Sequence, residues 1–299
     1  MKLHQKIRIL IYILICPSLL NQILCQSFTE IDVGIESSSF TEVAFGDYDN
    51  DGDLDIIIVG DGKSSIYRND GSEIFTDINA NIPGISYGSI DWGDSDNDGD
   101  LDILITGQSG GEYITKIILN SSNDVFIENS STDFEGVYLG DAKWGDYNSD
   151  GFLDVIISGQ SQSGSEVCKL YKNNKDNTFS EVQTTFSPVD YSDLAWGDYD
   201  KDGDNDIIIT GLDFSGNKTT RLYKNEGDNL FADVSANIEG VYLGSVSWGD
   251  YNSDGHLDIL ISGMNNHDYG ITKIYKNNKD GTFSELEQNI LSTSEGGSS

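Results

Sequence analysis

The stretch FGDYDNDGDLDIIIVG, residues 45–60, joins an acidic loop to a β-branched run and decides the fold. Its acids alternate, with Asp47, Asp49, Asp51 and Asp55 at positions one, three, five and nine and Gly52 at position six. Four more copies of the loop begin, first after 47 residues and then every 52 residues, at Asp94, Asp146, Asp198 and Asp250. The period and the acidic pattern therefore describe one repeated unit.

Alternating carboxylates in a tight loop are typical of a calcium site. Ca²⁺ takes six to eight oxygen ligands at about 2.3–2.6 Å, and a short loop can supply them from every second residue. Glycine at position six permits the sharp turn, and the backbone carbonyl at position seven adds a ligand. An isolated loop of this kind is more often a solvated turn. Five loops in phase predict about five bound Ca²⁺ ions.

The expected ligands at positions one, three, five, seven and nine are, loop by loop, Asp47, Asp49, Asp51, Asp53 and Asp55; Asp94, Asp96, Asp98, Asp100 and Asp102; Asp146, Asn148, Asp150, Phe152 and Asp154; Asp198, Asp200, Asp202, Asp204 and Asp206; Asp250, Asn252, Asp254, His256 and Asp258. Asn148 and Asn252 replace a carboxylate, so these two sites are expected to bind more weakly. Only the carbonyl of His256 is expected to bind, and its imidazole is predicted to be exposed. Asn205 stands where the other loops have leucine, so an apolar anchor is lost there.

Four short strands are predicted in each repeat. An aromatic-Gly-Asp motif precedes each loop, and it contains Phe45 in the first copy and, in the others, the four tryptophans of the chain, Trp92, Trp144, Trp196 and Trp248. The β-branched run after each loop reads as a buried strand. In the last copy two further strands are expected at 271–276 and 282–287. Short strands at this spacing indicate an all-β protein, and a period near 50 residues favours a β-propeller of four-stranded antiparallel blades.

The last copy carries the motif Trp-Gly-Asp-Tyr-Asn-Ser-Asp-Gly-x-Leu-Asp, then Ile-Tyr-Lys-Asn-Asn and Gly-Thr-Phe. This motif resembles the FG-GAP (VCBS-type) repeat, a family shared by the head propellers of integrin α-subunits. The resemblance covers about residues 28–288. It implies an extracellular, integrin-α-like propeller that holds Ca²⁺ in the loops between the first two strands of each blade. It also implies a role in adhesion, carbohydrate binding or assembly.

Five blades are predicted at about residues 39–80, 86–131, 138–186, 190–236 and 242–288, whereas integrin-like propellers have seven. An extra strand is predicted at 28–32. It can cap a closed five-bladed ring or replace the last outer strand in a ring-closing exchange, or the chain can form part of a larger or multi-chain ring. A closed five-bladed ring is favoured, because closure removes exposed strand edges. The Ser- and Gly-rich tail, residues 292–299, is expected to be disordered.

Residues 1–25 have the composition of a secretory signal peptide, with Lys2, Lys6 and Arg8 before a mostly apolar stretch. A membrane anchor and lipid attachment at Cys25 are the alternatives. We therefore expect a secreted, extracellular or cell-surface protein in which only Cys168 remains. Removal of residues 1–25 takes away three positive charges, so the formal net charge changes from −34 to −37. Five bound Ca²⁺ ions would bring it to about −27. This charge disfavours nucleic acid and anionic membranes as partners.

The expected strand order places the loops between the second and third strands opposite the calcium loops. They carry the candidate ligand-binding residues Tyr113, Phe214, His267, Asp268 and Tyr269. Four tyrosines recur between the blades, and their recurrence favours packing over binding; they are Tyr87, Tyr138, Tyr191 and Tyr242. Glycosylation sequons occur at Asn120, Asn129 and Asn217, of which the first also fits a turn.

The sequence contains no nucleophile with an adjacent base, no histidine-rich metal set and no phosphate-binding loop. We therefore expect a non-enzymatic module for recognition or adhesion, which binds an extracellular protein or glycan. One alternative is an architectural subunit of an extracellular assembly, including self-assembly. Another is a polysaccharide-active enzyme whose hydrolytic pair comes from two loop acids.

Overall fold

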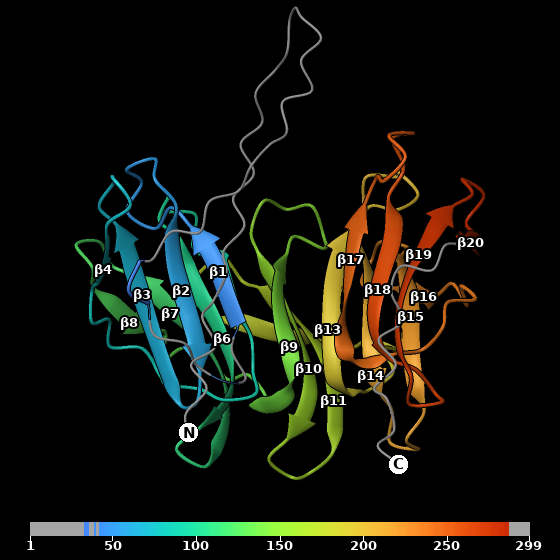
Figure 1. Ribbon diagram of the computed structural model, residues 1–299, viewed down its shortest axis with the longest axis horizontal. Helices are drawn as coiled ribbons and strands as arrows, with labels where there is room; N and C mark the ends of the chain where they lie inside the picture. The colour runs from blue at the N-terminus through green and yellow to red at the C-terminus, as the bar shows by residue number, and fades with distance from the viewer. Residues whose placement is uncertain (1–32, 36–38, 40–41, 287–299) are drawn as a thin grey trace, which may run out of the picture.

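The computed structural model describes residues 33–35, 39 and 42–286, and these contain strands β1 to β20 and no helix. The strands form five consecutive groups of four, blades 1 to 5 (Figure 1). Blades 1 and 2 contain β1 (Glu42–Gly46), β2 (Asp55–Gly60), β3 (Lys63–Asn69) and β4 (Phe75–Asp77), then β5 (Ile90–Gly93), β6 (Asp102–Ser109), β7 (Glu112–Asn120) and β8 (Phe126–Glu128). Blade 3 contains β9 (Val137–Gly145), β10 (Asp154–Ser161), β11 (Glu166–Asn173) and β12 (Phe179–Val182). Blades 4 and 5 contain β13 (Asp190–Gly197), β14 (Asp206–Leu212), β15 (Lys218–Asn225) and β16 (Phe231–Asp233), then β17 (Tyr242–Gly249), β18 (Asp258–Met264), β19 (Gly270–Asn277) and β20 (Phe283–Glu285).

Each blade is an antiparallel meander in which consecutive strands pair in chain order. In blade 4, Trp196 of β13 lies opposite Ile207 of β14, which lies opposite Tyr223 of β15. In blade 4 the second strand is buried from Asp206 to Gly211 because the neighbouring blades cover both of its faces, and this explains why its sequence is a β-branched run without alternation. The predicted all-β fold of four-stranded antiparallel blades is confirmed. No described segment is a helix long and apolar enough to cross a membrane.

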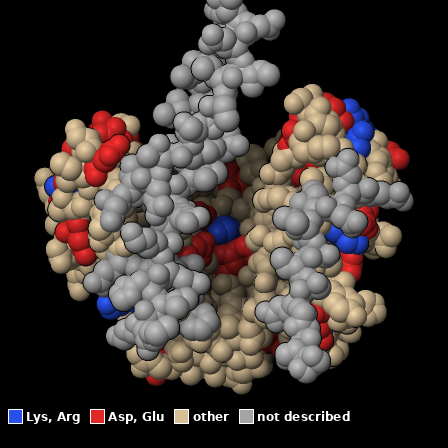
Figure 2. Space-filling view, in the orientation of Figure 1, with Lys and Arg blue, Asp and Glu red and all other residues tan. Residues whose placement is uncertain are grey.

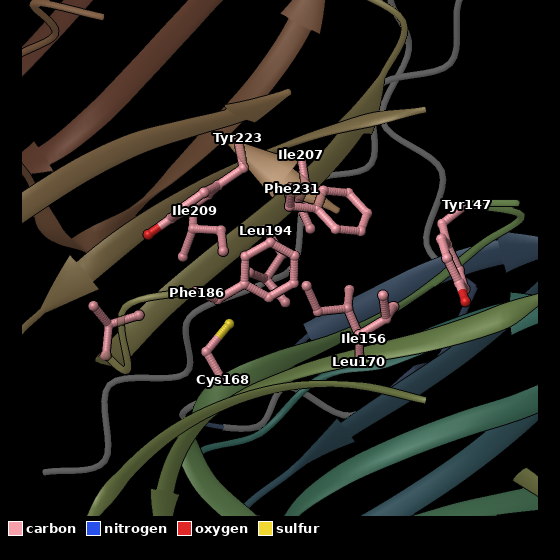
Figure 3. Packing of buried hydrophobic residues seen from close by; sticks show 11 residues of the cluster. Tyr147, Ile156, Cys168, Leu170, Phe186, Leu194, Ile207, Ile209, Tyr223 and Phe231 are labelled. Carbon is pink, nitrogen blue, oxygen red and sulfur yellow. The ribbon is translucent and has the colours of Figure 1, made fainter. Parts of the chain in front are cut away.

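The hydrophobic core is divided among the interfaces between consecutive blades. Between blades 3 and 4, Ile156 and Leu170 pack with Phe186 and Ile207, and the free thiol of Cys168 is buried beside them (Figure 3). The tryptophan of each later blade lies against the glycine of the aromatic-Gly-Asp motif in the blade before it. A Cβ atom at Gly145, for example, would lie 2.5 Å from Trp196 Nε1. A larger residue than glycine would therefore push the blades apart.

Side chains of one blade cover the inner edge of the next. Apart from one pairing of Val137 in β9 with Ile114 in β7, the first strand of a blade pairs on one side only, so the N–H groups of its other edge need acceptors. Five of them donate across the blade interfaces: Ile90 N to Glu42 Oε2 at 3.3 Å, Ala142 N to Ser89 Oγ at 2.9 Å, Trp144 N to Asp91 Oδ2 at 3.0 Å, Leu194 N to Asp141 Oδ2 at 3.1 Å and Val246 N to Asp193 Oδ2 at 2.6 Å. The inner strands are thereby connected in the order β1, β5, β9, β13, β17.

Blades 5 and 1 do not make a corresponding interface within residues 42–286, so the favoured closed ring is not formed by these residues. Figure 1 shows the two blades on opposite sides of the view, and the space-filling view in Figure 2 shows a recess between them. On blade 5, Leu260 is 42 % exposed, whereas its counterpart Ile208 is fully buried, and no atom lies within 4 Å of a Cβ atom placed on Gly249. Unpaired strand edges do not force the ring to close. The blades meet through their faces, and side chains of the neighbouring blade already cover the inner edge of each first strand.

Three predicted segments lie outside the described residues. They are the signal peptide at 1–25, the extra strand at 28–32 and the tail at 292–299. The five described groups of strands span residues 42–77, 90–128, 137–182, 190–233 and 242–285.

Candidate metal loops and ligand face

The acidic loops, numbered 1 to 5 from Asp47, Asp94, Asp146, Asp198 and Asp250, join the first and second strands of each blade. Their position-one carboxylate closes the turn. In loop 1, Asp47 Oδ1 accepts the N–H of Asp51 and Oδ2 accepts the N–H of Gly52, both at 3.0 Å. The other loops repeat both bonds. Gly52 has a φ of 95°, a left-handed conformation that favours glycine.

The position-nine aspartate connects each loop to the third strand. The buried Asp55 accepts the N–H of Tyr48 at 3.1 Å through Oδ2 and the N–H of Asn69 at 2.8 Å through Oδ1. Both bonds recur at Asp102, Asp154, Asp206 and Asp258. Burial raises the pKa of Asp55 and Asp102 to about 6, and that of Asp154 and Asp206 to about 7. A cation in the loop would oppose this effect, because a nearby positive charge favours the carboxylate form.

The donor atoms of the loops fit a hard cation. In loops 1, 2 and 4, one oxygen from each of positions one, three and nine lies within 4.8 Å of the others; the sets are Asp47, Asp49 and Asp55, Asp94, Asp96 and Asp102, and Asp198, Asp200 and Asp206. At position three, Asp96 Oδ1 and Asn148 Oδ1 are buried and have no hydrogen-bond partner among the described residues. Oxygen donors with unpartnered lone pairs are the ligands that Ca²⁺ prefers.

Loops 3 and 5 differ from the others at position three. The side-chain amide of Asn148 donates to Asp154 Oδ2 at 3.4 Å, and that of Asn252 donates to Asp258 Oδ2 at 3.3 Å. The asparagine therefore occupies a lone pair of the carboxylate that a metal would use. This contact, together with the missing charge, supports the expectation that loops 3 and 5 bind a cation more weakly than loops 1, 2 and 4. The carbonyl ligand at position seven stays a prediction.

Two side chains of the loops differ from their predicted environment. The imidazole of His256 is half-buried and its Nδ1 is buried, so the prediction that it is exposed is wrong. The reason is that position seven lies near the turn between the third and fourth strands; in loop 3, Lys175 from that turn lies 4.8 Å from the ring centre of Phe152. The lost leucine at Asn205 is replaced by a hydrogen bond, in which Asn205 Nδ2 donates to Asp146 O of blade 3 at 3.0 Å.

Lysines from the third strand compete for the loop carboxylates. In blade 4, Lys224 Nζ forms ion pairs with Asp200 and, at 2.9 Å, with Asp202 Oδ2. Both carboxylates are predicted metal ligands, at positions three and five. Blade 2 has Leu119 in place of this lysine. A cation that enters loop 4 must therefore displace the ammonium group from at least one carboxylate.

We expect the substitution Lys224→Met to raise the Ca²⁺ affinity of loop 4 about fivefold, because a partly exposed ion pair contributes up to about 1 kcal/mol. Titration calorimetry of the variant and the parent protein measures the change. Lys116→Met is the matched control, because Lys116 pairs with Glu128 away from the acidic loops. An unchanged binding curve would mean that Lys224 does not compete with the metal.

The five candidate ligand residues lie on different loops at the other end of the blades. Phe214 is 84 % exposed in the loop of blade 4, and Tyr269 is 66 % exposed in that of blade 5, with the ring of His267 at 6.3 Å. Asp268 pairs with Lys218 Nζ at 3.1 Å, and Tyr113 stacks on Tyr138 at 4.6 Å. The structure therefore places these residues around one face without gathering them into a single site.

The four recurring tyrosines contact one another between blades and are not members of the core clusters. Tyr87 and Tyr138 form an edge-to-face pair at 5.8 Å, and Tyr191 and Tyr242 form another at 5.9 Å. Sequence reasoning missed Lys218, whose Nζ lies 5.2 Å from the ring centre of Tyr242. The sequence did contain a signal for Lys218: it stands at the start of the third strand of blade 4, and the corresponding position of blade 2 holds the candidate ligand residue Tyr113.

The structure removes two of the three glycosylation candidates. The side chains of Asn120 and Asn129 are buried, and their amide groups donate to the carbonyl oxygens of Tyr48 at 2.8 Å and Asn177 at 2.9 Å. Their amide nitrogens are therefore inaccessible in the folded protein, and Asn120 holds two blades together. Asn217 is exposed on the loop of blade 4.

Comparison with known proteins finds the FG-GAP-like repeat family at residues 30–105, 146–209, 198–261 and 250–299. No curated protein matches the chain significantly. Among solved structures, the chain is similar to a lectin from Agrocybe aegerita, whose title describes specific recognition of non-reducing terminal N-acetylglucosamine. The two are 19 % identical with a TM-score of 0.48, and the match covers 82 % of this chain and 64 % of the lectin chain.

Proposed function

Because the chain belongs to the FG-GAP-like repeat family, we propose that it is a calcium-binding, non-enzymatic recognition module that acts outside the cell. The composition of residues 1–25 supports the location. The acidic loops support the proposed calcium binding, because their donor atoms are oxygens and because the carboxylates of positions one, three and nine converge in three of the loops.

The metal has a structural role in this proposal. The same aspartates that offer oxygens to a cation also hold the turn and the third strand. The loops touch across blades as well, since Asn50 Nδ2 donates to Gly99 O of loop 2 at 3.1 Å. A cation in each loop therefore stabilises the ends of the blades and their interfaces.

Recognition is assigned to the opposite face, and the observation that carries it is the exposure of Phe214 and Tyr269 at the tips of two neighbouring loops. Exposed aromatic side chains at loop tips are unfavourable in water and are enriched where proteins bind partners. The partner is a protein or a glycan.

A glycan array probed in the presence of Ca²⁺ tests this assignment. Phe214→Ala and Tyr269→Ala are each expected to weaken binding at least tenfold, because a buried aromatic contact contributes about 1–2 kcal/mol or more at an interface. Leu230→Ala is the control, because Leu230 is exposed on the turn at the calcium end of blade 4. Binding that is unchanged in both variants, or turnover of a polysaccharide by the protein, would contradict the proposal.

A further inference from the structure

The four interfaces between consecutive blades repeat the same contacts. The glycine of the aromatic-Gly-Asp motif in one blade receives the tryptophan of the next blade, and a Cβ atom on this glycine would lie 2.5–2.8 Å from the indole ring. Two residues after the glycine, Tyr48 lies nearly parallel to Trp92, and Tyr199 to Trp248, with the ring centroids 6.3 Å apart in each pair. Each interface therefore joins the glycine side of one blade to the aromatic side of the next.

The glycine side of blade 5 is uncovered at these positions. No atom lies within 4 Å of a Cβ atom placed on Gly249, and Tyr251 is 47 % exposed. The tyrosines at the same position of blades 1, 3 and 4 are buried, because the next blade covers them. The exposed Leu260 belongs to the same side. An apolar patch of this kind marks an interaction site.

The aromatic side of blade 1 is exposed in the same way. Phe45 stands where the later blades have tryptophan and is 44 % exposed, and Leu54 is 55 % exposed. In blade 3 the leucine that corresponds to Leu54 lies beside the glycine of the preceding blade, since Leu153 Cδ1 would be 2.7 Å from a Cβ atom on Gly93. Blade 1 therefore presents the ring and the leucine that a glycine side receives.

Hydrogen bonds across the interfaces have the same direction. The asparagine that ends the third strand of blades 2 to 5 donates to a carbonyl group of the blade before it; Asn277 Nδ2, for example, donates to Tyr199 O at 2.9 Å. Its counterpart in blade 1, Asn69, donates to Leu54 O of its own blade at 3.1 Å. On blade 5, the carbonyl of Tyr251 corresponds to the Tyr199 acceptor. The two uncovered sides are thus complementary in polar as well as apolar groups.

The two sides do not meet within one chain. Blades 1 and 5 lie on opposite sides of the view in Figure 1, and Figure 2 shows a recess between them. Bringing them together would shift the four packed interfaces, in which the indole already lies against the glycine. A second copy of the chain supplies the missing side without any such change.

We propose that the glycine side of blade 5 binds the aromatic side of blade 1 in a second copy of this chain. The contact continues the interface that already joins blades 1 to 5. Phe45 and Leu54 of one copy cover Gly249 of the other, and Tyr251 packs on the Phe45 ring. Because two different faces meet, association continues beyond a dimer unless the copies close a ring. This assembly goes beyond the recognition function and does not depend on its ligand.

The charge of the chain opposes this association at low ionic strength. Each copy has a formal net charge of −34, and like-charged copies repel one another. Salt screens this repulsion, whereas the proposed contact is mostly apolar. Association is therefore expected to strengthen when the NaCl concentration rises from about 0.02 M to about 0.15 M.

Sedimentation velocity over a range of protein concentrations, in saturating Ca²⁺ and about 0.15 M NaCl, measures the association. Gly249→Val leaves the free protein intact, because no atom lies near the added Cβ atom, but it occupies the place of the Phe45 ring. Phe45→Gln removes that ring from the other side. Each variant is expected to weaken association about tenfold or more. Ile127→Gln changes an exposed residue on the fourth strand of blade 2, and this control is expected to associate as the parent protein does.

A mixture of the two variants tests the direction of the contact. Gly249→Val keeps an intact aromatic side and Phe45→Gln keeps an intact glycine side. The mixture is therefore expected to form a one-to-one dimer that grows no further. If Phe45→Gln fails to fold, Leu54→Glu takes its place in both experiments, with the same expected loss.

A parent protein that stays monomeric at every concentration overturns the proposal, and so does association that is unchanged in Gly249→Val. A mixture that stays monomeric while the parent protein associates also overturns it, because association then uses another pair of surfaces. None of these outcomes bears on the glycan array, so the assembly and the recognition function fail separately.

Discussion

Chelation of Ca²⁺ is expected to lower the melting temperature of the protein by about 15 °C. With free Ca²⁺ near 1 mM and a Kd near 0.1 mM, linkage gives about 1.4 kcal/mol for each loop and about 7 kcal/mol for five. That free energy is comparable to the net stability of an ordinary domain. In a domain of this size each kcal/mol shifts the melting temperature by about 2 °C. Calorimetric melting in 1 mM CaCl₂ and in excess EDTA measures the difference.

The control for this experiment is Mg²⁺, which demands octahedral geometry and releases its water reluctantly, so it is expected to restore little of the lost stability. Asp96→Asn provides a matched variant, because it gives loop 2 the asparagine that loop 3 carries naturally as Asn148. It is expected to reduce the shift by part of the contribution of one loop, because a loop with asparagine at this position binds Ca²⁺ more weakly. Equal melting temperatures with and without EDTA would show that the loops do not hold stabilising Ca²⁺.

The repeating part of the fold could be predicted from the sequence because each feature has a local physical cause. Gly52 permits the turn of the acidic loop, and the β-branched run from Ile56 forms a buried strand. The tryptophan of one blade packs against the glycine of the blade before it, as Trp196 does against Gly145, because only glycine leaves space for the ring. Each cause recurs with the period, so five copies reinforce one interpretation.

The parts that escaped prediction arise where the repeats differ. Closure depends on the outer face of blade 5, and nothing local distinguishes Leu260 from its buried counterparts. The four recurring tyrosines contact one another in pairs, Tyr87 with Tyr138 and Tyr191 with Tyr242, but outside the core clusters. They alternate between two neighbouring positions in successive blades. The first of these positions is left-handed at Tyr87, Leu139, Tyr191 and Leu243, a conformation that the sequence does not reveal.

A buried charge cluster on the inner strands also depends on residues that differ between blades. Lys143 of β9 lies 3.3 Å from Asp141 Oδ1 and 3.7 Å from Glu42 Oε1, and its side chain is 23 % exposed. Burial alone would lower the pKa of Lys143, but Asp141, Glu42, Asp91 and Asp193 raise it. Figure 2 shows such a basic group among acidic groups in the recess between the first and last blades. One cation thus balances carboxylates from four blades.

The pH dependence of this cluster follows from its carboxylates. Burial, with repulsion from Asp141, raises the pKa of Glu42 to about 8 and that of Asp193 to about 7. The native state therefore binds more protons than the unfolded state above about pH 5, so stability is lost as the pH rises through 7 to 8. Lys143→Met removes the balancing charge. We expect it to lower the free energy of unfolding by about 3 kcal/mol at pH 8, where Glu42 and Asp193 ionise, and by about 1 kcal/mol at pH 5.5, where both are protonated.

Urea unfolding at pH 8 and at pH 5.5 measures the two losses of unfolding free energy. Saturating Ca²⁺ is used because bound metal keeps the loop carboxylates ionised at both pH values, so that the change with pH comes from the inner cluster. Lys143→Arg keeps the charge and is expected to lose less than about 1 kcal/mol at either pH. Adding Glu42→Gln to Lys143→Met removes one of the unbalanced carboxylates, and we expect it to recover part of the loss at pH 8 and little at pH 5.5. A loss of the same size at both pH values would mean that Lys143 stabilises the inner strands through the packing of its alkyl chain, and that its charge is not what holds the four blades together.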